Sequence, residues 1–138
     1  MNWRGRQLMS LVDNTNAKTI TYLYDADGLR GSKTVNNAKT TYTYVGDKLC
    51  YQHTANVDGS TNYELYFFYD STGALSVIQY YVHSGETVTG YTYYVLCNTS
   101  GDVLGLYDGN GVLRVSYEYD AWGNVISVED ANGTTITN

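Results

Sequence analysis

Apolar and polar side chains alternate with a period of two along much of the chain. In residues 113–119 the aliphatic and aromatic side chains occupy every second position, at Leu113, Val115, Tyr117 and Tyr119. Side chains point alternately to the two faces of a β-strand, so this pattern predicts strands with one apolar and one polar face. Helical spacing occurs only around Leu8, Leu11 and Val12, and that stretch fits a strand equally well.

A turn phrase follows several of these stretches. It consists of an aromatic residue, a spacer, Tyr-Asp, two spacers and Gly, and it occurs at 22–28 and 117–123, with looser copies at 42–49 and 67–75. The aspartate can accept a hydrogen bond from the backbone two residues on, and the glycine can take a positive φ, so each copy predicts a β-hairpin. The residues that we expect to have structural roles in these hairpins are Tyr22, Tyr24, Asp25, Gly28, Tyr42, Tyr44, Tyr69, Asp70, Gly73, Tyr117, Tyr119, Asp120, Trp122 and Gly123.

Composition supports an all-β fold. The chain contains 16 tyrosines and 14 glycines but no proline, which would remove a hydrogen-bond donor from a strand inside a sheet. We expect roughly ten to twelve strands in one module spanning residues 1–138, arranged as consecutive antiparallel β-hairpins that form a curled sheet. An open sheet leaves unpaired edges, and these favour self-association.

Charge is distributed unevenly. The net charge is -6, and from Gly59 onward Arg114 is the only strong base against nine acidic residues. A nucleic-acid partner is disfavoured, because phosphate binding depends on basic side chains. The chain has no apolar run near the roughly 20 residues of a membrane span, and we expect no N-terminal signal peptide within this fragment. The end units of a repeat array normally carry capping features, and none is evident in this sequence. We therefore expect the chain to be a fragment of a larger protein.

The repeated phrase, with its Tyr-Asp-Ala-Trp-Gly-Asn-Val version at 119–125, resembles the RHS or YD-repeat family. The resemblance covers nearly the whole chain and places it just upstream of that family's C-terminal core. It implies a bacterial protein, secreted or on the cell surface, whose repeats form a β-sheet shell around a C-terminal toxin. The implied partners are neighbouring repeats and the enclosed C-terminal polypeptide. The chain ends before the self-cleaving core, so the resemblance implies no catalytic residue and no cofactor here.

A second hypothesis is a carbohydrate-binding surface module. Exposed aromatic side chains can stack on sugar rings, and the segment 63–69 is aromatic on both faces. Tyrosines of adjacent strands also pack on one another, which stabilises a sheet that lacks an aliphatic core. We therefore expect packing to be the main role of the tyrosines.

A third hypothesis is an enzyme or metal site, and it depends on Cys50, His53, His83 and Cys97 coming together. Cys50 and His53 are three residues apart, which on a strand places them on opposite faces. The spacing of all four lacks the close pairs of a zinc site, and a disulfide between Cys50 and Cys97 stays open. The Asp-rich loops faintly resemble calcium loops but lack the further ligands, so we interpret them as turns.

Overall fold

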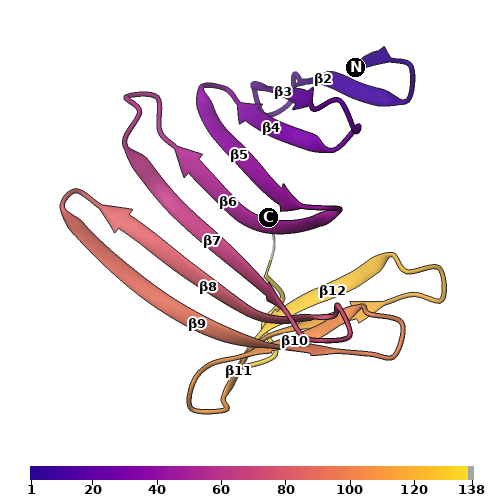
Figure 1. Ribbon diagram of the computed structural model, residues 1–138, viewed down its shortest axis with the longest axis vertical. Coiled ribbons are helices and arrows are strands. Elements are labelled where there is room, and N and C mark those ends of the chain that lie inside the picture. The colour runs from indigo at the N-terminus through magenta and orange to yellow at the C-terminus, as the bar shows by residue number, and fades with distance from the viewer. Residues whose placement is uncertain (137–138) are drawn as a thin grey trace. The chain divides into compact units, whose positions relative to one another are not determined.

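A computed structural model describes residues 1–136, which form twelve β-strands and contain no helix (Figure 1). The strands are β1 (Asn2–Arg4), β2 (Gln7–Asp13), β3 (Lys18–Tyr24), β4 (Arg30–Val35), β5 (Ala38–Val45), β6 (Lys48–Ala55), β7 (Thr61–Tyr69), β8 (Leu75–Ser84), β9 (Thr87–Cys97), β10 (Val103–Tyr107), β11 (Leu113–Tyr119) and β12 (Val125–Asp130). The all-β prediction is confirmed, and the stretch around Leu8 is a strand. No helix long and apolar enough to cross a membrane is found among the described residues.

The strands follow one another through the sheet in chain order, from β1 to β12. Neighbouring strands from β1 to β7 and from β9 to β12 pair antiparallel, as consecutive hairpins require. Thr40 of β5 lies opposite Thr54 of β6, for example, and Tyr117 of β11 lies opposite Val128 of β12. Tight two-residue loops join some strands, and Gly46 takes a φ of 61° in the loop between Val45 and Lys48.

The chain forms two compact units. Unit 1 comprises Met1–Tyr66 and Tyr81–Thr89, and unit 2 comprises Phe67–Tyr80 and Gly90–Asn138. Strands β7, β8 and β9 each contribute residues to both units. Every candidate site lies entirely within one or the other of these two units.

Among the described residues, no hydrophobic side chain is fully buried. The buried side chains are small and polar: Ser32, Thr40 and Thr54. The Thr40 and Thr54 hydroxyl oxygens are 2.9 Å apart and share a hydrogen bond across β5 and β6. Alternation is visible in β3, where Ile20, Tyr22 and Tyr24 are half-buried while the residues between them are exposed. Strand pairing and half-buried side chains, rather than a central core, therefore hold the fold together.

Candidate functional site

The predicted turns share one hydrogen-bond pattern. After β3, the Asp25 amide donates to the Leu29 carbonyl at 2.9 Å, and the Gly28 amide donates to the Asp25 carbonyl at 3.2 Å. Asp25 Oδ1 also accepts from the Leu29 amide at 2.8 Å. Gly28 has a φ of 85°, a conformation that a residue with a Cβ rarely adopts. The same backbone bonds recur in the turns that begin at Asn56, Asp70, Asn98, Asp108, Asp120 and Asp130.

Hydrogen bonds to the carboxylates favour their ionised form. The Thr72 hydroxyl and nearby backbone amides lower the pKa of Asp70. The Asn124 side chain lowers the pKa of Asp120 in the same way. These oxygens are engaged by the turn itself, which supports interpreting the Asp-rich loops as turns. Among the described residues, no group of three or more His, Cys, Asp or Glu side chains is arranged to hold a metal ion.

A β-bulge and a tyrosine hydroxyl recur just before these turns. The register of β3 against β4 shifts between Leu23 and Tyr24, and that of β11 against β12 shifts between Glu118 and Tyr119. The Tyr24 hydroxyl then donates to the carbonyl of Leu8 near the start of β2, at 3.0 Å. We call this contact, from the end of one strand to the start of the preceding strand, the tyrosine latch.

Two further tyrosines make the same latch. The Tyr44 hydroxyl at the end of β5 donates to the Arg30 carbonyl at 3.2 Å, and the Tyr119 hydroxyl donates to the Val103 carbonyl at 2.8 Å. Arg30 and Val103 are the first residues of β4 and β10. A bulge between Thr43 and Tyr44 also precedes the Tyr44 latch. The structure therefore gives the second tyrosine of the phrase a specific contact that the sequence pattern did not reveal.

Cys97 takes the latch position at the end of β9. Its Sγ donates to the carbonyl of Leu75, the first residue of β8, at 3.7 Å. The turn that begins at Asn98 follows directly, as the aspartate turn follows the latch tyrosines. Cys97 thus stands where other copies of the phrase have tyrosine.

The other residues of the phrase have varied surroundings. The Arg30 guanidinium lies over the Tyr22 ring, 4.6 Å from its centroid, and burial raises the pKa of Tyr42. Trp122 is 89% exposed at the tip of its turn. The chain after Tyr44 turns through the two-residue Gly46 loop instead of an aspartate turn, because its aspartate follows the glycine rather than preceding it.

A polar cluster centred on Glu64 crosses three strands of unit 1. The Tyr51 hydroxyl donates to Glu64 Oε1, and the Tyr66 hydroxyl approaches the same oxygen at 3.4 Å. His83 Nε2 lies 2.9 Å from Glu64 Oε2. His53 is directly opposite Glu64 in the β6–β7 pairing, and its Nε2 is 3.1 Å from Thr61 Oγ1. We call Tyr51, His53, Glu64, Tyr66 and His83 the Glu64 cluster.

The protonation states of Glu64 and Tyr51 favour a structural role for the Glu64 cluster. The hydrogen bond from Tyr51 lowers the pKa of Glu64, so its carboxylate is charged at neutral pH. Burial, together with the neighbouring carboxylate, raises the pKa of Tyr51, so its phenol stays neutral. The cluster therefore offers neither a protonated acid nor a phenolate. The sequence pattern does not single out Glu64 as a site residue, although its being the one acidic residue in the aromatic run 63–69 is a signal.

The enzyme hypothesis required two cysteines and two histidines to meet. His53 and His83 both lie beside Glu64, but the Cys50 thiol donates to the carbonyl of Lys48 at 3.5 Å. Cys97 belongs to unit 2 and contacts Leu75. Both cysteines are free thiols. Among the residues that the structure describes, no three of these four side chains form a group that could hold a metal ion.

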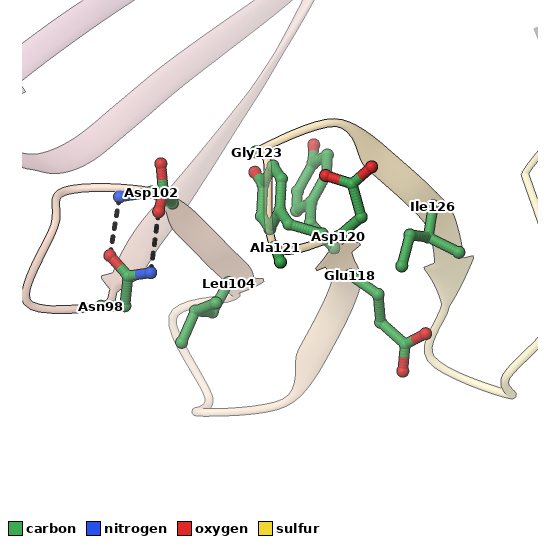
Figure 2. A pocket seen from close by; sticks show the side chains of 10 residues that line it. Asn98, Asp102, Leu104, Glu118, Asp120, Ala121, Gly123 and Ile126 are labelled. Carbon is green, nitrogen blue, oxygen red and sulfur yellow. Dashed lines mark hydrogen bonds between the residues drawn. The ribbon is translucent and has the colours of Figure 1, made fainter.

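Unit 2 contains an open hollow beside the Asp120 turn (Figure 2). Three carboxylate residues line it, Asp102, Glu118 and Asp120, together with Leu104 and Ile126. Figure 2 shows Leu104 and Glu118 directed to one side of the strands, and Asp120 directed to the other. Across the hollow, Asn98 is hydrogen-bonded to Asp102 through both its side-chain atoms. The lining contains no basic residue.

A row of tyrosines lies next to a second hollow of unit 2. The rings of Tyr80 and Tyr91 are 6.1 Å apart at an interplanar angle of 27°, and those of Tyr91 and Tyr93 are 6.4 Å apart at 17°. Tyr91 is 47% exposed. The hollow is lined by Tyr91, Tyr93 and the ion pair of Arg114 with Asp108, in which Arg114 Nη2 is 2.6 Å from Asp108 Oδ2.

Comparison with known proteins adds to these observations. A family model described as teneurin YD-shell matches residues 2–134. The chain is 36% identical over 109 residues to the tRNA3(Ser)-specific nuclease WapA of Bacillus spizizenii. It is 35% identical over 109 residues to the tRNA nuclease WapA of Bacillus subtilis. Each alignment covers 79% of this chain but only 4% of the relative, so the chain spans a small part of those proteins.

Proposed function

The chain belongs to the teneurin YD-shell family, and from this premise we propose that it is a non-enzymatic scaffold segment of an RHS-repeat protein. In this proposal the sheet is a length of wall that separates a polypeptide from its surroundings. The enclosed polypeptide is a C-terminal toxin carried by the same parent chain. The parent protein is bacterial and is secreted or displayed at the cell surface.

One observation supports the scaffold role above all. Twelve strands pair in chain order, while no hydrophobic side chain is fully buried among the described residues. A free-standing globular domain would bury apolar side chains around a core. A sheet whose stability comes from strand pairing, aspartate turns and latches is suited to being continued by further strands on both sides.

The nuclease names of the relatives are consistent with a toxin in the parent protein. Those names describe proteins of which this chain matches only 4%. The Glu64 cluster has both carboxylate oxygens hydrogen-bonded, with Glu64 charged and the Tyr51 phenol neutral. We therefore assign any catalytic activity of the parent protein to a segment other than this one.

Edge pairing tests the scaffold proposal. The 138-residue chain should form dimers or larger species in light scattering, because the edge of β1 and the first part of β12 have no neighbouring strand among the described residues, while residues 135–136 pair with Val128 and Glu129 near the end of β12. Adding lysines at those strands, by Trp3→Lys with Ile126→Lys, should shift it toward monomer. The matched control is Thr21→Lys with Thr43→Lys, at exposed positions of inner strands β3 and β5. A wild-type chain that is monomeric at every concentration would contradict the proposal.

The tyrosine row supports a second candidate, a surface module that binds carbohydrate. Tyr80, Tyr91 and Tyr93 present nearly parallel rings, and Asp108 with Arg114 could supply polar contacts to a sugar. Titration with a panel of oligosaccharides should then change the tyrosine fluorescence, and Tyr91→Ala should abolish the change. No response across the panel would remove this candidate.

A further inference from the structure

The net negative charge of the chain lies in one unit. Unit 1 carries seven basic and seven acidic side chains, whereas unit 2 carries Arg114 against seven acidic ones. The net charge of -6 therefore belongs entirely to unit 2. Arg114 is itself paired with Asp108, through Nε at 2.8 Å and Nη2 at 2.6 Å. The remaining six carboxylates of unit 2 have no basic residue of their own unit left to pair with.

Some of these carboxylates share a sheet face with exposed apolar side chains. In the register of β9 to β12, Leu96 lies opposite Gly105, Gly105 opposite Ser116, and Ser116 opposite Glu129. Directly opposed residues point to the same face, and so do residues two apart on one strand. Tyr94 and Glu118 therefore lie on this face as well. Tyr94 is 53% exposed and Leu96 is 47% exposed.

Register shifts add two more apolar side chains at one end of this face. Leu104 stands at the shift between Val103 and Gly105, and Ile126 stands at the shift opposite Glu118 and Tyr119. Ile126 is 65% exposed. Both line the hollow of Figure 2 together with Asp102 and Glu118. We call Tyr94, Leu96, Leu104, Glu118 and Ile126 the acidic-apolar face.

Among the described residues, the hydrogen bonds to the carboxylates of Glu118 and Asp102 come from neutral donors. Glu118 Oε2 accepts from the Ser127 hydroxyl at 3.2 Å, and Asp102 Oδ2 accepts from the Asn98 side chain at 2.8 Å. A lysine or arginine side chain combines an aliphatic stem with a cationic head, which matches aliphatic side chains bordered by carboxylates. A bare metal ion would leave Leu104 and Ile126 uncovered, and nucleic acid would be repelled by the charge.

We propose that the acidic-apolar face is a docking surface for an extended basic polypeptide segment that presents Lys or Arg and apolar side chains on the same face, at positions two or four residues apart. Its cationic side chains enter the hollow beside Glu118 and Asp102, and its apolar side chains pack on Tyr94 and Leu96. This inference rests on the scaffold function, because the partner is the polypeptide that the wall encloses. Charge complementarity also makes the attraction salt-dependent.

Peptide binding by the 138-residue chain tests the docking proposal. The probe is a twelve-residue peptide that repeats Lys-Ser-Leu-Ser, so that Lys and Leu share one face when it is extended, and it is compared with a Glu-Ser-Leu-Ser peptide and a Lys-Ser-Ser-Ser peptide. The Lys and Leu peptide should bind, and the other two should bind at least about five-fold more weakly, because each lacks one of the two contacts. Equal binding of all three peptides, or binding of none, would overturn the proposal.

Matched variants locate the binding surface. Glu118→Gln with Ile126→Ser should weaken binding of the Lys and Leu peptide about five-fold. Val45→Ser with Asp47→Asn removes the same kinds of side chain from unit 1, where Val45 is 71% exposed, and should leave binding unchanged. Equal losses in the two variants would overturn the proposal. Circular dichroism checks that each variant keeps its β-sheet, and the single Glu118→Gln substitution replaces the pair if it does not.

A photo-reactive version of the Lys and Leu peptide gives a readout on the unmodified chain. Crosslinks should fall within residues 94–105 and 116–129, and crosslinks confined to residues 1–66 would overturn the proposal. The outcome is separable from that of the scaffold proposal. A chain that associates through its edges but binds no peptide loses the docking surface and keeps its scaffold role.

Discussion

At the scale of single residues, the latch tyrosines connect the end of one strand to the start of the strand before it. Tyr24, Tyr44 and Tyr119 all donate to a backbone carbonyl in or at the start of the preceding strand. The acceptors lie 14 to 16 residues away in the chain. Each latch therefore fixes a complete hairpin, which a local turn alone does not.

Removing one latch hydroxyl should weaken the fold measurably. Tyr24→Phe is expected to lower the free energy of unfolding by about 1 kcal/mol, because the Leu8 carbonyl loses its donor. Tyr22→Phe on the same face of β3 is the matched control and should change it by less than about 0.5 kcal/mol. Urea denaturation measures both. Equal effects of the two substitutions would show that the latch contributes nothing specific.

The aspartate of the turn needs only an oxygen acceptor. Asn98 makes the same backbone contacts as Asp120, so Asp120→Asn should be tolerated better than Asp120→Ala. The alanine variant, which loses the acceptor, should lower the melting temperature by on the order of 5 °C. Differential scanning calorimetry measures the change, with Asp47→Ala as the control for loss of charge. An alanine variant as stable as the asparagine variant would refute this role for the carboxylate.

Sequence and structure agree best where the contact is local. Asp25 and Gly28 were predicted from their spacing because both partners of the turn lie within five residues. The partner of the Tyr24 hydroxyl is set by strand register, which alternation does not specify. The role of Cys97 was missed for the same reason, although Asn98 and Gly101 after it match the turn phrase.

At the scale of elements, bulges and close strand approaches shape the hairpins. Gly105 of β10 lies where a Cβ atom would be 3.0 Å from Leu113 Cδ1 and 3.3 Å from the Val115 carbonyl oxygen. The backbone oxygen cannot move without disturbing the pairing of β10 with β11. Glycine is needed at position 105 because β10 and β11 approach each other closely there, and not because the backbone turns.

A methyl group at this position should therefore be costly. Gly105→Ala is expected to lower the free energy of unfolding by about 1–3 kcal/mol because of overpacking. Gly109→Ala, where a Cβ would meet nothing within 4 Å, is the matched control and should have little effect. Chemical denaturation compares the two. The interpretation is wrong if Gly105→Ala is as stable as Gly109→Ala.

The Glu64 cluster makes stability depend on pH. Its carboxyl has a folded-state pKa below the ordinary value of 4.5, so its stabilising effect is complete above about pH 5.5 and is lost as pH falls through the folded-state pKa. At pH 7, Glu64→Gln should lower the free energy of unfolding by about 1–2 kcal/mol. Tyr51, Tyr66, His53 and His83 all face this carboxylate.

Denaturation of wild type and variant at pH 7 and pH 3 checks this expectation. The difference between them should be smaller at pH 3 than at pH 7, because the stabilising effect of the ionised Glu64 carboxylate is lost as the pH falls through its lowered folded-state pKa. Glu86→Gln, in the loop after β8, is the control for loss of an acidic charge. A difference that stays constant between the two pH values would contradict the assigned cause.

Strand existence was predictable at this scale, but register was not. The alternation in β3 and β11 identified both strands, while the bulges next to Tyr24 and Tyr119 left no mark that the pattern reveals. Glu64 meets Tyr51 and His83 only because β6, β7 and β8 present them together. The sequence shows that Glu64 is the only charged residue of an aromatic strand, but it does not show which side chains contact Glu64.

At the scale of the whole molecule, the repeats form one sheet that lacks a buried apolar centre among the described residues. Unit 1 has equal numbers of basic and acidic side chains, whereas unit 2 has a net negative charge. Similar hairpins can therefore have surfaces of different charge. Family membership followed from the repeated phrase and is confirmed by the match over residues 2–134. The single-module boundary and the enclosed toxin stay predictions, because they depend on the parent protein.

The structure of the intact parent protein, determined by electron cryomicroscopy, tests the scaffold account most directly. The account predicts that β1 and β12 are both hydrogen-bonded to neighbouring strands of the parent chain, and that the sheet continues as a wall with a polypeptide on one side. A separately folded domain whose β1 and β12 edges face solvent, with no polypeptide against either face, would contradict it.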